Sequence, residues 1–360
     1  MQPHGTCCPA EEDAPIAKPT PKLAKVTLQE VARRAQVSPM TVSNYVNGKH
    51  GAMSQATRER VADAVAQLGY RPDTAGRSLR SARQLSIGMI VVDESPLYLS
   101  DGSTTQAISG LGTSLNARGY TLQLEGLPAR ELARSTLLSH LRSDGLCVLL
   151  SGAPAARRAM LEQVLALNQP VVVLYERLAA GPDACCVLQD DRAGGSLLAR
   201  HVIGRGARRL LLVKMSLNRW KAVDEREAAI LAAAKGEPDT TVERVGCGAG
   251  SFAEVQAAVT AAIERHGLPD AIMAMTDQIG IAVLKLMKAK GIAVPGRVKV
   301  TGFNGFEFWQ YSDPVLTTVR SPAHQLGQIA GQEMIARLEQ GAFAKPVIKL
   351  PVELVVGETT

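Results

Sequence analysis

Two hydrophobic patterns divide the chain near residue 84. Before that point, apolar residues recur at helical spacing, as in Leu28, Val31, Ala32 and Ala35, which stand at i, i+3, i+4 and i+7. After it, short continuous apolar runs such as LSIGMIVVD alternate with amphipathic stretches. Uninterrupted apolar strands separated by helical crossovers are typical of a parallel α/β sheet. The pattern therefore predicts a small all-α domain followed by a large α/β domain.

Local signals predict three helices in the small domain. Thr27 and Glu30 have the spacing of a capping box at the start of the first helix. Ser38 is a good N-cap for the second helix, and Pro39 follows at the first helical position, where no amide is missed. A third helix begins after a serine and stops at Gly69. Two short helices joined by a tight turn and covered by a third predict a helix-turn-helix domain, and a small helical cap without a ligand is the alternative.

The large domain contains six apolar runs that fit buried strands, at residues 85–93, 144–150, 169–176, 208–215, 269–275 and 298–304. Helical segments separate them, among them residues 105–118, 193–203 and 280–290. This number of strands predicts two parallel sheets. Such sheets bind ligands outside the carboxyl ends of their strands. The residues there mix carboxylates, amides, hydroxyls, an arginine and aromatic rings, which suits a small polyhydroxy or anionic ligand.

The net charge of +6 lies entirely in one segment. Residues 25–83 hold 10 Lys or Arg against 4 Asp or Glu, whereas residues 84–360 hold 28 against 27. A basic module joined to a nearly neutral domain is what a polyanion-binding protein shows. The charge distribution and the helix pattern together predict that the small domain binds nucleic acid.

Composition sets further limits on the protein. A length of 360 residues suits two or three domains, and residues 1–24 are Pro-rich without an apolar core, which predicts a disordered tail rather than an export signal. No apolar run reaches the roughly 18 to 20 residues that span a bilayer, so we expect a cytoplasmic protein without membrane contact. Six cysteines without a C-x-x-C spacing predict free thiols and no metal site. A redox role for Cys7 and Cys8 is the alternative.

Residues 72–83 predict a short hinge helix that is too short to be stable alone. Leu79 is flanked there by Arg77 and Arg80. Arginines neutralise phosphates while an apolar side chain wedges between base steps in the minor groove, so we expect this helix to form on DNA. A solvated linker with one stray leucine is the alternative.

Residues 26–48, VTLQEVARRAQVSPMTVSNYVNG, and the stretch TRERVADAVAQLGYRPDTAGRSLRS resemble the LacI/GalR family of bacterial transcription regulators. The resemblance implies a helix-turn-helix headpiece and a hinge helix joined to a two-lobed domain like the type I periplasmic sugar-binding proteins. It places Pro39, Met40 and Asn44 where the family reads base edges, His50 in a backbone-contacting loop, and Leu79 at the operator centre. The family commonly has arginine at the Asn44 position, so adenine recognition by this asparagine is expected instead of a guanine contact.

The DNA-binding residues that we expect are Thr27, Ser38, Pro39, Met40, Thr41, Ser43, Asn44, Asn47, His50, Arg77, Ser78, Leu79 and Arg80. We expect the domains to be a tail at 1–24, the headpiece at 25–71, the hinge helix at 72–83 and the effector domain at 84–360. The first lobe is expected at about 84–186 and 320–347, and the second at about 187–319 and 348–360.

The resemblance continues through the large domain in QDDRAGG (189–195), residues 274–305 and residues 313–327. It places Arg226 where family members grip a sugar hydroxyl or a carboxylate. Where the family usually has an Asn-Asp pair, this chain has Thr276-Asp277. Asn304 stands where the family usually has an aspartate whose carboxylate often binds ligand hydroxyls. A more anionic ligand, such as a sugar acid, becomes a hypothesis. The effector-binding residues that we expect are Tyr98, Tyr175, Glu176, Asp191, Arg226, Phe252, Asp277 and Asn304.

Three classes of function compete. A solute-binding protein for a transporter is disfavoured, because it would need an export signal and would not need the basic helical segment at residues 25–83. An enzyme is not expected, because the chain has no G-x-S-x-G elbow, P-loop, H-E-x-x-H or strand-linked G-x-G-x-x-G, and no cofactor is implied. The sequence predicts a DNA-binding repressor that is controlled by a sugar, a sugar acid or a related metabolite, with control by a protein partner or by no effector as alternatives. We expect a homodimer, or a tetramer, on a near-palindromic operator.

Overall fold

The computed structural model describes residues 26–51, 53–71, 83–140, 142–177, 181–217 and 219–360. The chain separates into two compact units on either side of residue 80. Within the described ranges, no helix is both long and apolar enough to cross a membrane. Several predictions on single residues lie outside these ranges, namely those for Cys7, Cys8, Arg77, Ser78, Leu79 and Arg80. The predicted tail (1–24) and nearly all of the predicted hinge helix lie outside them as well.

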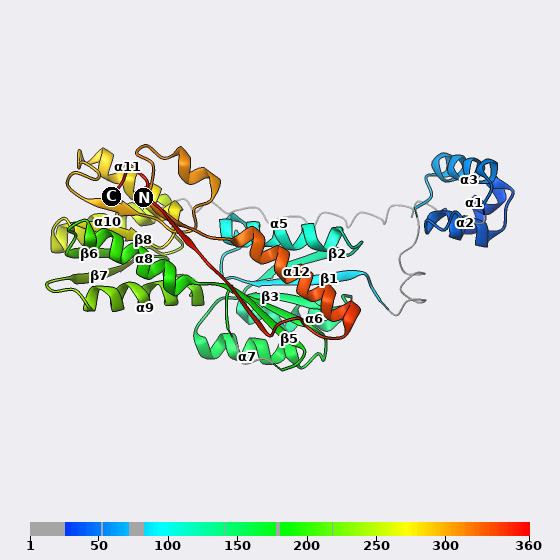
Figure 1. The fold of residues 1–360 in the computed structure, drawn as a ribbon, viewed down its shortest axis with the longest axis horizontal. Helices are drawn as coiled ribbons and strands as arrows, with labels where there is room; N and C mark the ends of the chain where they lie inside the picture. Colours follow the sequence, from blue (N-terminus) through cyan, green and yellow to red (C-terminus); the bar gives the residue numbers. More distant parts are fainter. Residues whose placement is uncertain (1–25, 52, 72–82, 141, 178–180, 218) are drawn as a thin grey trace, which may run out of the picture. The chain divides into compact units, whose positions relative to one another are not determined.

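The first unit, here called the headpiece (residues 26–71), is built from α1 (Leu28–Ala35), α2 (Pro39–Val46) and α3 (Gln55–Leu68) (Figure 1). The predicted capping box is confirmed, since Glu30 N–H donates to Thr27 Oγ1 at 3.3 Å and Thr27 N–H donates to Glu30 Oε2 at 2.6 Å. Gly69 ends α3 in the left-handed conformation, as predicted. The buried core contains Val31, Ala32, Ala35, Val42, Val61 and Ala64. Local capping and one small apolar core therefore define the headpiece.

A six-stranded parallel sheet forms the centre of what we call the first lobe of the second unit (Figure 1). In sheet order its strands are β11 (Val347–Leu350), β5 (Ala184–Gln189), β4 (Val171–Leu174), β3 (Leu146–Leu150), β1 (Ser86–Val92) and β2 (Thr121–Leu127). Its helices are α5 (Gly102–Asn116), α6 (Thr136–Ser139), α7 (Pro154–Leu165) and α12 (Ala323–Gln340), with 3-10 turns η1 (Tyr98–Ser100) and η2 (Ala129–Arg134). Apolar cores fill both faces of the sheet, which explains why β1, β3 and β4 are continuous apolar runs.

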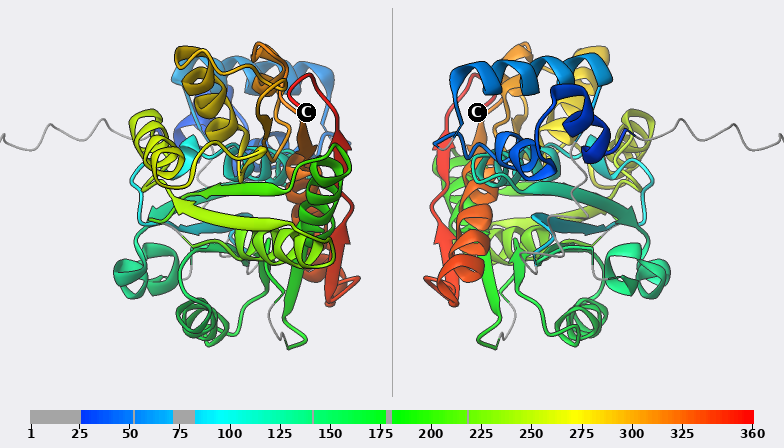
Figure 2. Two further views of the ribbon diagram at one scale, coloured as in Figure 1. Left: turned by 90° about the vertical axis from the view of Figure 1, so that its left-hand side faces the viewer. Right: turned by 90° about the vertical axis from the view of Figure 1, so that its right-hand side faces the viewer.

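A four-stranded parallel sheet forms the centre of the second lobe. In sheet order its strands are β7 (Thr241–Gly246), β6 (Arg209–Lys214), β8 (Ala271–Ala274) and β9 (Lys299–Thr301). The helices of this lobe are α8 (Asp191–Gly204), α9 (Lys221–Lys235), α10 (Phe252–His266) and α11 (Asp277–Ala289), with the 3-10 turn η3 (Glu307–Tyr311). Helices cover both faces of this sheet (Figure 2). The prediction of two parallel sheets is confirmed.

Three chain segments pass from one lobe to the other. They follow β5, β10 (Thr318–Arg320) and β11, and β10 pairs with β12 (Glu353–Val355) in a separate antiparallel ladder. In the first lobe, β5 runs to Gln189 and β11 runs to Leu350, near the bounds expected at about 186 and 347.

Helices α5 and α12 pack with their backbones in direct contact. A Cβ atom on Gly110 would lie 1.9 Å from the carbonyl oxygen of His324, and one on Gly327 would lie 1.9 Å from that of Ala107. Both positions therefore require glycine. This close packing fixes α5, whose first turn faces the space between the lobes.

Candidate DNA-binding and effector-binding sites

Helix α2 presents the predicted reading face of the headpiece. Its N-cap Ser38 accepts a hydrogen bond from Thr41 N–H at 3.1 Å, and Pro39 takes the first helical position. Val42 is buried, which turns the opposite face outward, and Met40 is 62% exposed. Residues at i and i+4 share one face of a helix, so Pro39, Ser43 and Asn47 lie together and Met40 lies above Asn44. This face can enter a major groove.

Three other residues predicted to contact DNA have roles within the headpiece. Thr27 caps α1, and Asn47 Nδ2 donates to the carbonyl oxygen of Ser43 at 2.7 Å. His50 is half-buried with its ring edge-to-face against Tyr45, at 5.5 Å between centroids. Its buried Nδ1 atom has no hydrogen-bond partner within the described part of the chain. These contacts show that His50 also packs the loop after α2.

A cavity of about 360 Å³ lies between the two lobes of the second unit, at the carboxyl ends of both sheets. Its apolar surface comes from Leu97, Leu149, Leu150, Leu174, Met215, Trp220, Met275 and Ile279. Five of the predicted effector-binding residues line it, namely Tyr98, Tyr175, Glu176, Arg226 and Asn304. A volume of this size suits a single small-molecule ring or a modified one.

Arg226, from α9, is held at the centre of the cavity wall by groups of the second lobe and the segments that join the lobes. Its Nε donates to Asp191 Oδ1 at 2.7 Å, Nη1 to the carbonyl oxygen of Met275 at 2.9 Å, and Nη2 to Asn304 Oδ1 at 3.3 Å. The guanidinium carbon also lies 3.6 Å from the centroid of the Phe303 ring. Arg226 is therefore positioned before any ligand binds, and its charge is compensated by Asp191.

Three predicted effector-binding residues do not line this cavity. Asp191 lies behind Arg226, and its Oδ1 accepts from both Arg226 Nε and Gln189 Nε2, so it positions the arginine. Asp277 is 1% exposed to solvent and accepts from Gly305 N–H at 2.6 Å and from Thr318 Oγ1, and it borders only an adjoining groove. Burial raises the pKa of Asp277 to about 7.

Phe252 does not line the cavity either. It is the first residue of α10, and a capping box between Ser251 and Glu254 fixes that helix end. The ring is 43% exposed, and Lys285 Nζ lies 4.7 Å above its centroid. The neighbouring Ser251 lines the cavity instead.

Two prominent cavity residues are not among the predicted effector-binding residues. Trp220 is the N-cap of α9 and packs against the apolar core of the first lobe. Asp101 caps α5, accepting from Thr104 N–H at 2.8 Å. An N-cap signal before the predicted helix at 105–118 could have identified Asp101, whereas the position of Trp220 depends on the packing between lobes.

The charges around the cavity do not favour an anion. Both basic residues that line it within the described chain are paired, Arg226 with Asp191 and Lys221 with Glu225, whose Nζ and Oε1 lie 2.5 Å apart. Three carboxylates line the cavity as well, from Asp93, Asp101 and Glu176. An anionic ligand would have to compete with Asp191 and Glu225 for these two cations. It would also approach carboxylates of like charge, of which Glu176 is itself paired with Arg157.

Two protein-family models match the chain, one in the headpiece and one in the large unit. The family described as bacterial regulatory proteins, lacI family, matches residues 27–73, and the periplasmic binding protein-like domain matches residues 199–360. The chain belongs to the LacI family. It is thus a DNA-binding transcriptional regulator of the effector-controlled type, with a fold like that of its LacI-family relatives.

Several LacI-family proteins resemble the chain over nearly its whole length. The HTH-type transcriptional repressor PurR of Vibrio atlanticus (strain LGP32) is 28% identical over 339 residues, covering 92% of this chain and 98% of PurR. The solved complex of the regulator CelR with cellobiose is 25% identical, with a TM-score of 0.66, and covers 93% of this chain and 100% of that chain. The Lac repressor dimer bound to operator and the anti-inducer ONPF is 23% identical, with a TM-score of 0.75, and covers 93% and 99%.

Proposed function

We propose that this regulator is a repressor whose operator affinity is controlled by an uncharged, ring-containing effector that binds between the lobes. The observation that carries the proposal is the cavity itself, in which a pre-positioned arginine has its charge already balanced. The relatives are named as repressors, and CelR was solved with cellobiose, a neutral sugar. A neutral sugar therefore fits better than the sugar acid that the Asn304 substitution suggested.

The cavity offers both a stacking surface and hydrogen-bonding groups to such a ligand. Tyr98 and Trp220 supply aromatic surface, which stacks on the faces of sugars and heterocycles. Because Asn304 Oδ1 accepts from Arg226, the amide nitrogen of Asn304 remains as a donor at the cavity wall. Carboxylate oxygens of Asp101 and Glu176 accept from ligand O–H or N–H groups. The ligand that matches is rich in donors and has one flat apolar face.

On the DNA side, we propose that α2 reads base edges with Pro39, Met40 and Asn44. Met40 presses on a thymine methyl group, and Asn44 forms two hydrogen bonds with adenine. Two protomers, joined through their large units, present two headpieces to a near-palindromic site in the cytoplasm. The hinge segment then forms on the minor groove, with Leu79 as the wedge. Effector binding changes the relation between the lobes, and hence the spacing of the two hinges.

Matched pairs of neutral and anionic compounds test the ligand class. Thermal shift of the full-length protein is measured with glucose and glucuronate, ribose and ribose 5-phosphate, cellobiose and cellobionate, and adenine and AMP. The proposal expects the melting temperature to rise with the neutral member of a pair and to stay unchanged with its acid, because ligand binding stabilises the folded state. Stabilisation only by acidic members would overturn it.

A further inference from the structure

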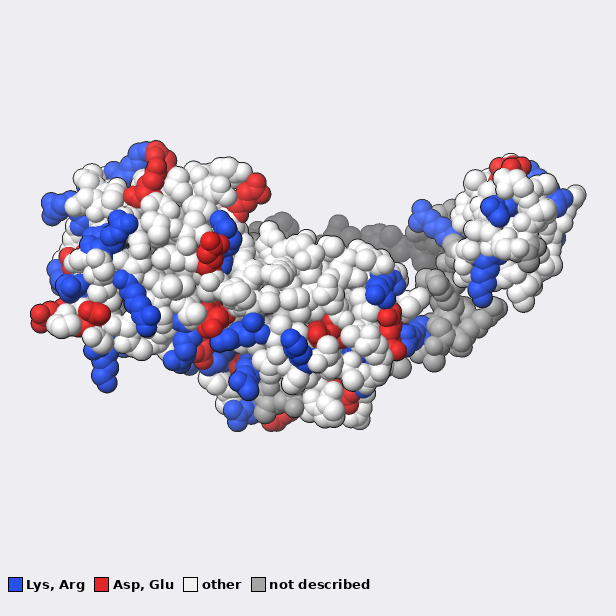
Figure 3. Space-filling model, in the orientation of Figure 1, with Lys and Arg blue, Asp and Glu red and all other residues white. Residues whose placement is uncertain are grey.

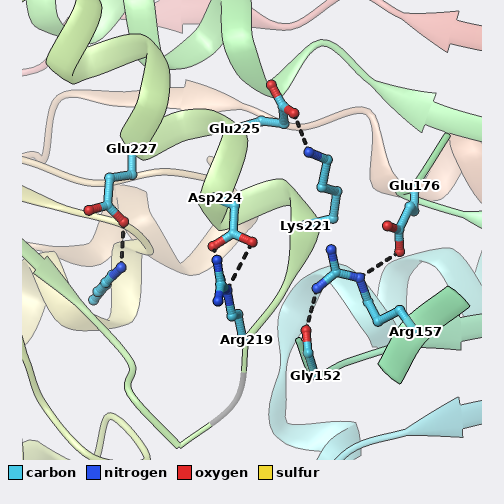
Figure 4. A network of polar contacts seen from close by, with 9 residues as sticks. Gly152, Arg157, Glu176, Arg219, Lys221, Asp224, Glu225 and Glu227 are labelled. Atoms are coloured by element: carbon cyan, nitrogen blue, oxygen red, sulfur yellow. Dashed lines mark hydrogen bonds and ion pairs between the residues drawn. The ribbon is translucent and has the colours of Figure 1, made fainter. Parts of the chain in front are cut away.

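Arg157 lies in the first turn of α7, and its side chain is buried. Its Nε donates to Glu176 Oε2 at 2.8 Å, and its Nη1 donates to the carbonyl oxygen of Gly152 (Figure 4). Burying two charges costs so much desolvation free energy that an apolar pair of the same volume is often as stable. The pair is therefore weak evidence for a role in stability alone, and its partners indicate another role.

Glu176 connects this ion pair to the effector cavity. It follows β4, and its side chain is 8% exposed and lines the cavity. Arg157 binds one carboxylate oxygen, and the other is directed away from Arg157 (Figure 4). A ligand that donates a hydrogen bond to this second oxygen therefore binds a carboxylate whose other oxygen is already bound by Arg157.

Gly152 connects the same arginine to the contact between the lobes. It follows β3 of the first lobe, and its N–H donates to the carbonyl oxygen of Arg219, in the second lobe, at 2.8 Å. Its φ of +116° is a conformation that residues with a side chain rarely adopt, so glycine is needed here. The Arg219 side chain in turn binds Asp224 of α9 at 3.1 Å (Figure 4). The same helix carries Arg226.

We infer that Arg157 is a positioning residue that couples the effector cavity to the contact between the lobes. Through it, movement of Glu176 is transmitted to Gly152 and so to Arg219 at the start of α9. The inference rests on the proposed control by an effector, since it specifies how occupancy of the cavity changes the relation between the lobes. The network is complete without a ligand, so its contribution to lobe closure is measurable without one.

The test follows Trp220, which belongs to the second lobe and packs against the core of the first lobe, so that separation of the lobes would expose it. The chain has 2 tryptophans, so a Trp309→Phe background leaves Trp220 as the single reporter. Arg157→Met is compared with the control variant Glu227→Gln. Glu227 forms ion pairs with Lys214 and Arg244, and all three residues lie in the second lobe. Acrylamide quenching of Trp220 and hydrogen exchange at the Gly152 amide are measured in the full-length protein without effector or DNA.

We expect Arg157→Met to raise both the quenching constant and the exchange rate about fivefold or more, with Glu227→Gln unchanged, because opening of the lobes exposes both probes. Glu176→Gln replaces the ion pair with Arg157 by a weaker, uncharged hydrogen bond. It should raise the quenching constant and the exchange rate by a smaller factor than Arg157→Met does. It serves as the deciding variant where Arg157→Met does not fold. The inference would be overturned if the quenching constant and the exchange rate of Arg157→Met and Glu176→Gln equalled those of Glu227→Gln. Because no ligand is present, that failure is distinct from failure of the effector proposal.

Discussion

Arg226 and Asp191 form a buried ion pair, with Nε and Oδ1 2.7 Å apart and side-chain exposures of 4% and 5%. The carboxylate comes from the first turn of α8 and the guanidinium from α9, so the pair joins two neighbouring helices of the second lobe beneath the cavity. Its position explains why the cavity holds an arginine and yet has no excess of positive charge.

Asp191→Ala should destabilise the protein strongly, because it leaves Arg226 buried without its counter-ion. Removing one partner of a buried pair costs about 3–5 kcal/mol. Urea unfolding of the full-length protein measures the free energy of unfolding. Glu339→Ala is the matched control, because it breaks the exposed pair with Arg118 and should cost at most about 1 kcal/mol. Equal effects of the two substitutions would contradict the account of the cavity.

The positions of Trp220 and Phe252 predict opposite effects on effector binding. Trp220→Ala should weaken the affinity for a ligand selected by thermal shift by about 10- to 100-fold, because the indole lines the cavity. Phe252→Ala should leave that affinity unchanged, since its ring lies under Lys285 outside the cavity. Isothermal titration calorimetry decides between them. A larger loss in Phe252→Ala would show that the cavity is assigned to the wrong surface.

Burial raises the pKa of Asp277 to about 7, so the folded protein keeps a proton that the unfolded chain releases near the ordinary value of 3.8. Stability from this proton is complete at pH values below the unfolded pKa and is lost as the pH rises through about 7. Asp277→Asn should remove this loss, which is on the order of 4 kcal/mol. Urea unfolding at several pH values measures it, with the exposed Asp313→Asn as control. Parallel profiles for wild type and Asp277→Asn would refute the prediction.

The hinge prediction concerns Leu79, which lies outside the described residues. Leu79→Ala should weaken specific operator binding while leaving most of the nonspecific, salt-dependent binding, because phosphate contacts do not need the wedge. Fluorescence anisotropy with operator and with unrelated DNA at several salt concentrations separates the two. Equal loss on both DNAs would exclude a wedge.

Much of the headpiece could be predicted from sequence because its signals are local. The residue pairs Thr27–Glu30 and Ser38–Pro39 define helix starts by contacts within one turn. In the large unit, β2 and β7 were missed because they are edge strands with partly exposed, mixed sequences. Buried runs such as β1 were found because their continuous apolar pattern is independent of what they pair with, whereas β5 (ACCVLQ) was not predicted although it is buried. Figure 3 shows acidic and basic residues interspersed over the drawn face of the large unit, consistent with its nearly balanced charge.

The candidate site was predictable only in part, because it depends on contacts between distant segments. Arg157 and Arg158 are adjacent in the sequence, yet the first is buried and the second is exposed. Helical spacing from Met160, Leu161 and Val164 places Arg157 on the buried face of α7. The ion pair that compensates its charge there could not be predicted, since Glu176 lies on another strand connection. Likewise, only the buried network of Arg226 shows that Asp191 supports the arginine and does not line the cavity.

The central claim is that a ligand in the cavity controls binding to DNA. Fluorescence anisotropy of labelled operator is measured with and without a saturating neutral compound selected by thermal shift, for wild type and for Arg226→Ala. The account predicts that the compound changes the operator Kd of the wild type by about 5- to 150-fold, and that Arg226→Ala keeps the ligand-free Kd but loses the response. An unchanged Kd in the wild type, or an undiminished response in Arg226→Ala, would contradict it.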